Sequence, residues 1–83
     1  MDIRSAQLFQ HLASSLNFSK TSEQMYVSPP TLTRVIQRLE EELGATLFFR
    51  DKRSVRLTAA GQRFAQFVRA WLDEWHQLQV DLQ

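Results

Sequence analysis

The sequence contains no cysteine among its 83 residues. It therefore has no disulfide framework and no thiolate ligand for a metal ion. Its two histidines, His11 and His76, lie far apart, and neither is part of a metal-binding pattern. No apolar run approaches the roughly 20 residues that cross a bilayer, and the N-terminus does not have the features of a signal peptide. We therefore expect a soluble, cytoplasmic protein with no metal site and no contact with a membrane.

The sequence also offers no residues for enzyme chemistry. It has no nucleophile with an adjacent base, no paired carboxylates and no phosphate-binding loop. We therefore expect no enzymatic activity and no cofactor. The length allows one small domain with a modest core. With 43% apolar and 23% charged residues, the chain is globular rather than disordered.

The net charge of +1 is small for a protein that binds nucleic acid, but its distribution is more informative than its sum. Residues 70–83 contain three acidic residues and neither lysine nor arginine. Residues 46–69 contain one acidic residue and six basic ones: Arg50, Lys52, Arg53, Arg56, Arg63 and Arg69. The positive charge is therefore concentrated in the middle of the chain.

Residues 28–44 predict one helix with both ends defined. Ser28 is a good N-cap, Pro29 suits the first helical position, and Gly44 suits the left-handed C-terminal position. The apolar residues recur at the helical period and predict a buried face: Leu32, Ile36, Leu39 and Leu43. The opposite face carries Pro30, Thr33, Arg34, Gln37, Arg38 and Glu41. Since acidic residues 40–42 gather at the negative end of the helix dipole, this pattern suits a helix whose N-terminal half approaches a polyanion. A solvated amphipathic helix is the alternative.

Two shorter helices precede this one. A stripe of Leu8, Leu12 and Leu16 predicts a first helix from Asp2 to about Leu16. Ser19 can cap a second helix from Lys20 to about Met25, with Met25 and Val27 in the core. Only residues 26–28 connect this helix to the next, which is typical of a helix-turn-helix.

The period changes after Gly44. Residues 46–50 and 54–58 are β-prone, and the charged residues Asp51, Lys52 and Arg53 separate them. We expect a β-hairpin with a cationic tip, which makes the layout that of a winged helix. The apolar residues Leu47, Phe48, Val55 and Leu57 close the core in this interpretation.

Another long helix begins after the cap Thr58 and runs from Ala59 to the end of the chain. Its apolar residues alternate in spacings of four and three and form a heptad seam: Phe64, Val68, Trp71, Trp75, Leu78 and Leu82. Such a helix is about 36 Å long, longer than the domain can cover, so the seam predicts an interface. The alternative is that the helix packs back on its own domain, which fits Phe64 and Phe67 best. Because no helix-stop signal precedes Gln83, we expect a fragment of a longer protein.

Several spaced motifs together resemble one family. They are Phe18-Ser19, Ser28-Pro29, Leu39-Glu40, Leu43-Gly44, Leu47-Phe48-x-Arg50 and Leu57-Thr58-x-Ala60-Gly61. In this combination the chain resembles the N-terminal domain of LysR-type transcriptional regulators, which are bacterial. The resemblance implies a mainly α, winged helix-turn-helix domain over residues 1–58 and a dimerisation helix over residues 59–83. It also implies a C-terminal effector-binding domain that this chain lacks.

The same resemblance implies the partners. These are double-stranded DNA, a second copy bound antiparallel through the long helix, and a small-molecule effector in the absent domain, with a tetramer for the full-length protein. Because a two-fold dimer presents two recognition helices, the operator should be an interrupted palindrome. The chain departs from the family at Thr21 and Ser22, where alanine is usual, at Thr33, where serine is usual, and at the double proline 29–30.

The wheel and the resemblance assign roles to residues in the recognition helix, 29–43, and in the wing, 50–56. Five are expected to read bases in the major groove: Pro29, Pro30, Thr33, Arg34 and Gln37. Nine are expected to contact phosphates or the minor groove: Ser19, Lys20, Thr21, Ser28, Thr31, Arg38, Lys52, Arg53 and Arg56. The six seam residues are expected to dimerise. Arg50 either contacts DNA or pairs with Glu40 inside the fold, and we favour the pair. The alternative function is a winged-helix module that binds proteins without reading DNA sequence.

Overall fold

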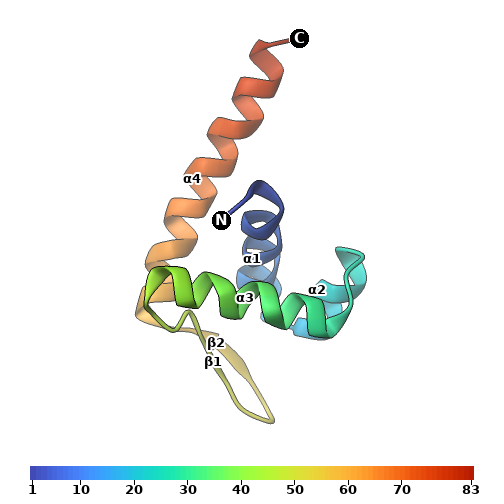
Figure 1. Ribbon diagram of the computed structural model, residues 1–83, viewed down its shortest axis with the longest axis vertical. Coiled ribbons are helices and arrows are strands. Elements are labelled where there is room, and N and C mark those ends of the chain that lie inside the picture. The colour runs from blue at the N-terminus through green and yellow to red at the C-terminus, as the bar shows by residue number, and fades with distance from the viewer.

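The computed structural model describes all 83 residues as four helices and one hairpin. The elements are α1 (Ile3–Ser15), α2 (Phe18–Gln24), α3 (Pro29–Leu43), β1 (Phe48–Arg50), β2 (Val55–Leu57) and α4 (Ala59–Asp81). Helix α3 lies across α1, the hairpin projects from one end of the molecule, and α4 extends to the other (Figure 1). The predicted fold class, a mainly α winged helix-turn-helix followed by a long helix, is confirmed. No helix is both long and apolar enough to span a membrane.

The ends of the first two helices differ from the prediction. Leu16 does not extend the buried stripe of α1, because it adopts a left-handed conformation (φ 54°) that ends the helix and leaves its side chain 39% exposed. The cap of α2 is Asn17 and not Ser19, since the Asn17 side chain accepts the Lys20 N–H at 2.8 Å. An extended asparagine is among the best N-caps. Helix α2 therefore begins at Phe18, two residues earlier than expected.

The core forms where α1, α3, the hairpin and the first half of α4 meet. Its buried apolar side chains are Ala6, Leu8, Phe9, Leu12, Leu32, Ile36, Leu39, Leu47, Phe48, Phe64 and Val68. The Phe9 ring lies at its centre, 4.7 Å from the Phe64 ring and 5.6 Å from the Phe48 ring. Leu43 was expected in this core but is 47% exposed. It occupies the last turn of α3, next to the left-handed Gly44 where the chain turns away.

A dense set of contacts joins the hairpin to α4. The Thr58 hydroxyl accepts the Gly61 N–H at 2.9 Å and donates to the Thr46 carbonyl at 2.6 Å. The Thr58 N–H donates to the Leu47 carbonyl at 3.0 Å. That carbonyl approaches Gly61 so closely that a Cβ there would lie 2.1 Å from its oxygen. Glycine at position 61 therefore lets the first turn of α4 pack on the base of the hairpin.

Helix α4 leaves the body of the domain half-way along its length. Phe64 and Val68 are buried in the core, whereas every residue from Asp73 onward is exposed. The projecting half of the helix accounts for the long dimension of the molecule, 45 Å against 26 and 19 Å. The domain core therefore extends beyond residue 58, as the alternative of a helix packed back on its own domain predicted for Phe64. The first half of α4 completes that core.

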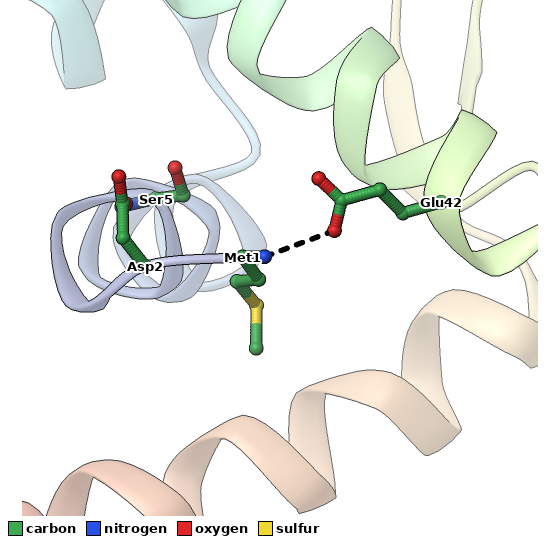
Figure 2. Close-up of polar contacts among 4 residues, drawn as sticks. All are labelled: Met1, Asp2, Ser5 and Glu42. Carbon is green, nitrogen blue, oxygen red and sulfur yellow. Dashed lines mark hydrogen bonds and ion pairs between the residues drawn. The ribbon is translucent and has the colours of Figure 1, made fainter.

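The start of the chain contacts the end of α3. The Met1 amino group forms an ion pair with Glu42 Oε2 at 3.0 Å, while Asp2 caps α1 by accepting the Ser5 N–H at 2.7 Å (Figure 2). That hydrogen bond from Ser5 holds the pKa of the Asp2 carboxyl below its usual value. The amino group places a positive charge beside the three glutamates at the C-terminal end of α3, which carry the unfavourable sign for that end of a helix dipole.

Candidate nucleic-acid interface

The N-terminal half of α3 presents a free polar face. Ser28 caps the helix, because its Oγ accepts the Thr31 N–H at 3.3 Å, and it also donates to Thr31 Oγ1 at 2.8 Å. Pro29 and Pro30 form the first turn without leaving an N–H unpaired. Four of the five residues predicted to read bases are exposed, namely Pro29, Pro30, Arg34 and Gln37, and Thr33 is half-buried. Arg34 forms no ion pair, since the only ion pair in the chain joins Met1 to Glu42. Its guanidinium is therefore available to an external acceptor.

A side chain of α1 contacts the turn before α3. The Arg4 guanidinium donates to the Met25 carbonyl at the end of α2. The next residue, Tyr26, has a positive φ of 57° and a side chain that is 92% exposed. A left-handed conformation is unfavourable for a bulky residue, so this contact helps to fix a strained turn. Sequence analysis missed Arg4, because no local pattern connects residues that are 21 positions apart.

Helix α2 does not place Thr21 at the surface. The Thr21 side chain is fully buried, and its hydroxyl bonds to His11 Nδ1 at 3.0 Å and to Ser15 Oγ at 2.8 Å. The expected phosphate contact from Thr21 is therefore wrong. The N–H groups of Lys20 and Thr21 are also occupied, by the side chain and carbonyl of Asn17. The side chains of Ser19 and Lys20 at this end of α2 are exposed and can contact a phosphate.

The tip of the wing is built around one carboxylate. Asp51 Oδ1 accepts the N–H groups of Arg53 and Ser54 at 2.7 and 2.8 Å. These two hydrogen bonds, that of Arg53 first, hold the pKa of the Asp51 carboxyl below its usual value. The single acid of this segment is thus occupied by the turn itself. Lys52 and Arg53 are left exposed at the tip.

The two arginines of the strands lie on aromatic rings. Strand pairing places Phe49 opposite Arg56, and the Arg56 guanidinium lies 5.5 Å from the Phe49 ring centre on the exposed face. The Arg50 guanidinium lies 3.8 Å from the ring centre of Phe18. Arg50 therefore does not pair with Glu40, and our expectation of that ion pair is wrong. Aromatic faces attract a cation because of their quadrupole, so both guanidinium groups are held in defined places.

Glu40 has a different structural role. Its Oε2 accepts the Leu47 N–H at 2.7 Å. The last turns of α3 and the first residue before β1 are thereby joined by a charge-assisted hydrogen bond. Since the Leu47 carbonyl also contacts the start of α4, one residue links the recognition helix, the wing and the long helix.

The exposed face of α3 and the hairpin lie next to each other (Figure 1). On duplex DNA they can contact the base edges and the phosphate backbone. Arginine and amide side chains on such a helix can bond to base edges in the major groove. Cations at a hairpin tip can bond to phosphates or enter the minor groove.

Comparisons with known proteins assign the family. The helix-turn-helix region of bacterial regulatory proteins of the LysR family matches residues 3–62. The chain belongs to the LysR family. It is 48% identical over 82 residues to the HTH-type transcriptional activator IlvY of Haemophilus influenzae, across 99% of this chain and 28% of that protein. It is 40% identical over 74 residues to the Hca operon transcriptional activator HcaR of Escherichia coli K12, across 89% of the chain and 25% of the relative. The chain thus spans little more than a quarter of the length of these LysR-family relatives.

Solved structures of LysR-family proteins have the same fold. The BenM DNA-binding domain in complex with catB site 1 DNA has a TM-score of 0.93 and 32% identity, covering 99% of this chain and 91% of that one. The CbnR DNA-binding domain in complex with DNA has a TM-score of 0.92 and 32% identity, covering 98% and 93% of the two chains.

Proposed function

We propose that this chain is the sequence-specific DNA-binding part of a LysR-type transcriptional regulator that acts in the cytoplasm as a homodimer and is not an enzyme. The observation that carries the proposal is the free N-terminal face of α3, with Arg34 and Gln37 exposed beside a cationic wing. The relatives whose names describe transcriptional activators, and the similar domains solved on DNA, support it.

Base reading falls to the exposed residues of α3. Arg34 can pair with the two acceptors of guanine, and Gln37 can bond to adenine. The ring carbons of Pro30 and the methyl of Thr33 can meet a thymine methyl. Pro29 stiffens the start of the helix, so these side chains reach the groove without first ordering a flexible turn.

Backbone positioning falls to residues at both edges of that face. Lys52 and Arg53 at the wing tip carry two charges beyond the body of the domain, and Arg56 lies on the exposed face of the same hairpin. At the other edge, Ser19 and Lys20 of α2 and the cap of α3 supply hydroxyl and cationic donors. The further candidates for phosphate contact are Ser28, Thr31 and Arg38. Such contacts fix the register of a protein on DNA and make its affinity fall with rising salt.

The dimer is proposed to form through the outer half of α4. The exposed apolar residues on its seam are Trp75, Leu78 and Leu82, with Trp71 half-buried at their inner edge. Phe67, in the first half of the helix, adds exposed surface next to Trp71. Phe64 and Val68 belong to the domain core and contribute no free surface. The charges along α4 favour an antiparallel pair. Its first half carries Arg63 and Arg69, while residues 73–81 carry three acids, so only antiparallel packing brings opposite charges together.

A two-fold axis relates the two recognition helices of such a dimer, and each helix binds one half-site. We therefore propose an operator that is an interrupted palindrome. A small-molecule effector and a tetramer are proposed for a full-length regulator of the length of the relatives, and neither involves the residues described above.

A selection of binding sites from a random duplex pool tests this function. We expect a palindromic motif with two equal half-sites, and an affinity that falls steeply as the salt concentration rises. The alternative is a winged-helix module that binds proteins. That function predicts recovery of no shared motif, together with an affinity for its partner that changes little with salt.

A further inference from the structure

A second cationic surface contains no residue of the recognition helix. It is a groove of about 930 Å³ between α1 and the first half of α4, and Met25 and Leu57 also line it. Three of its lining side chains are basic or imidazole, namely Arg4, His11 and Arg69. None of its eleven lining residues is aspartate or glutamate. The chain has nine acidic residues, yet none of them lines this groove, so the charge of its lining is positive.

The groove faces neither the proposed DNA surface nor the dimer seam. On α1 it uses Gln7, His11 and Ser14, whose mean direction lies about 165° around the helix from that of the four buried residues of α1, at 100° per residue. Because α3 packs on the buried side of α1, DNA held by α3 would not reach the groove. On α4 it uses Ala65 and Arg69, about 150° around the helix from Trp71 and Leu78 at 100° per residue. A second copy packed on the seam would also leave it open.

The two arginines of the groove have hydrogen-bond donors without partners. Arg4 uses one donor on the Met25 carbonyl, and a guanidinium has five. Arg69 has no carboxylate within ion-pair distance. The amide side chains of Gln7, Gln10 and Gln66 also line the groove and can both donate and accept. Met25, Leu57 and Ala65 add apolar surface to the lining.

We propose that this groove is a docking site for an acidic, amphipathic segment of a partner protein. Carboxylates of the segment pair with Arg4 and Arg69, where charge-assisted bidentate bonds are available, and its apolar side chains cover Met25 and Leu57. The mixed lining favours a peptide over a nucleic acid. A phosphate backbone could pair only with the two arginines, whereas a peptide can also cover the apolar groups. Because Arg4 also supports the turn before α3, the docked segment contacts a residue that positions the recognition helix.

The test uses the complete chain with uniform ¹⁵N labelling and a short helical peptide that carries glutamate at every fourth position and leucine between. A peptide of the same composition in scrambled order controls for charge alone. Arg69→Glu reverses one groove charge without touching the turn. Arg63→Glu is its matched control, because Arg63 is an exposed arginine on the same helix that does not line the groove.

We expect saturable binding of the peptide, with amide shifts concentrated at residues 4–14 and 65–69. Arg69→Glu should weaken binding at least about tenfold. Arg63→Glu should change the affinity less than twofold, which would show that the position of the charge matters. The scrambled peptide should bind more weakly, which would show that the order of its residues matters. The proposal is overturned if no saturable binding occurs up to millimolar peptide, if the shifts fall on α3 and the wing, or if both charge reversals weaken binding equally. It is also overturned if a random DNA duplex shifts the groove amides.

Discussion

The substitution Trp75→Glu tests the proposed dimer most directly. Trp75 is 39% exposed in the single chain and lies in the outer half of α4, with Leu78 one turn further on. A glutamate there would place one charge from each protomer inside an apolar interface. The domain core should be unaffected, because the last core residue, Val68, precedes position 75 by seven residues, about two helical turns.

The magnitude follows from the surface that the chain leaves open. The exposed fractions of Phe67, Trp75, Leu78 and Leu82 are 46, 39, 48 and 77%, together about two whole side chains per protomer. Burying these on both protomers is worth about 6–12 kcal/mol at about 1.5–3 kcal/mol for each large apolar side chain. Association costs about 4–15 kcal/mol. The dimer therefore depends on nearly all of this surface, and burying two unpaired carboxylates costs several kcal/mol each.

We expect Trp75→Glu to weaken dimerisation by more than about 5 kcal/mol, or about a thousandfold or more in the dissociation constant. Sedimentation at micromolar concentration should show a wild-type dimer and a monomeric variant whose circular dichroism is unchanged. His76→Glu is the control, since it adds the same charge about 120° around the helix from the centre of the seam. A wild type that sediments as a 9.7 kDa monomer, or a Trp75→Glu protein that stays dimeric, would refute the reasoning.

Four further substitutions test single contacts. Arg34→Ala should cost about 1–3 kcal/mol on the selected operator and relax preference at one base position, and equal losses on operator and random DNA would make it a phosphate contact. Arg53→Ala should weaken binding to all sequences and lower the salt slope by about one unit, and titrations with an unchanged slope would remove the wing tip from the interface. Gly61→Ala should lower the free energy of unfolding by about 1–3 kcal/mol, because the clash with the Leu47 carbonyl exceeds the gain of about 1 kcal/mol in helix propensity; a higher melting temperature would contradict this. Ser22→Ala should raise stability by about 1 kcal/mol, since its buried hydroxyl has no hydrogen-bond partner, and denaturant melts showing a loss would mean that the hydroxyl is satisfied.

The parts of the fold that the sequence predicted are those that depend on near neighbours. Ser28, Pro29 and Gly44 bound α3 at the residues expected, because a cap is decided within about one helical turn. Thr58 likewise caps α4 as predicted. The hairpin was predicted from an alternating pattern next to a charged turn, although its paired strands are shorter than the β-prone runs. Local chemistry also indicated the polar face of α3.

The errors at the helix ends, at Leu16, Asn17 and Leu43, are local, and the others concern contacts between distant segments. The heptad seam of α4 is one continuous pattern, yet its first residues face α1 and its last face solvent. A periodic pattern shows that a face is apolar but not what covers it. Thr21 illustrates the same limit, because its burial depends on His11 and Ser15 of another helix. Arg50 likewise lies on the ring of Phe18, 32 residues away in sequence, and not beside Glu40, which is ten residues away.

The connection at Leu47 has a consequence for how two half-sites could be read. Glu40 of α3 holds the Leu47 N–H, while the Leu47 carbonyl accepts from Thr58 and abuts Gly61 at the start of α4. Recognition helix, wing and dimerisation helix are thereby tied at one residue, with no flexible linker between them. In a dimer formed through α4, the distance between the two recognition helices is then fixed by the rigid packing of α4 on the domain. Because an added base pair both lengthens DNA and rotates the second half-site, such a dimer should tolerate little variation in half-site spacing.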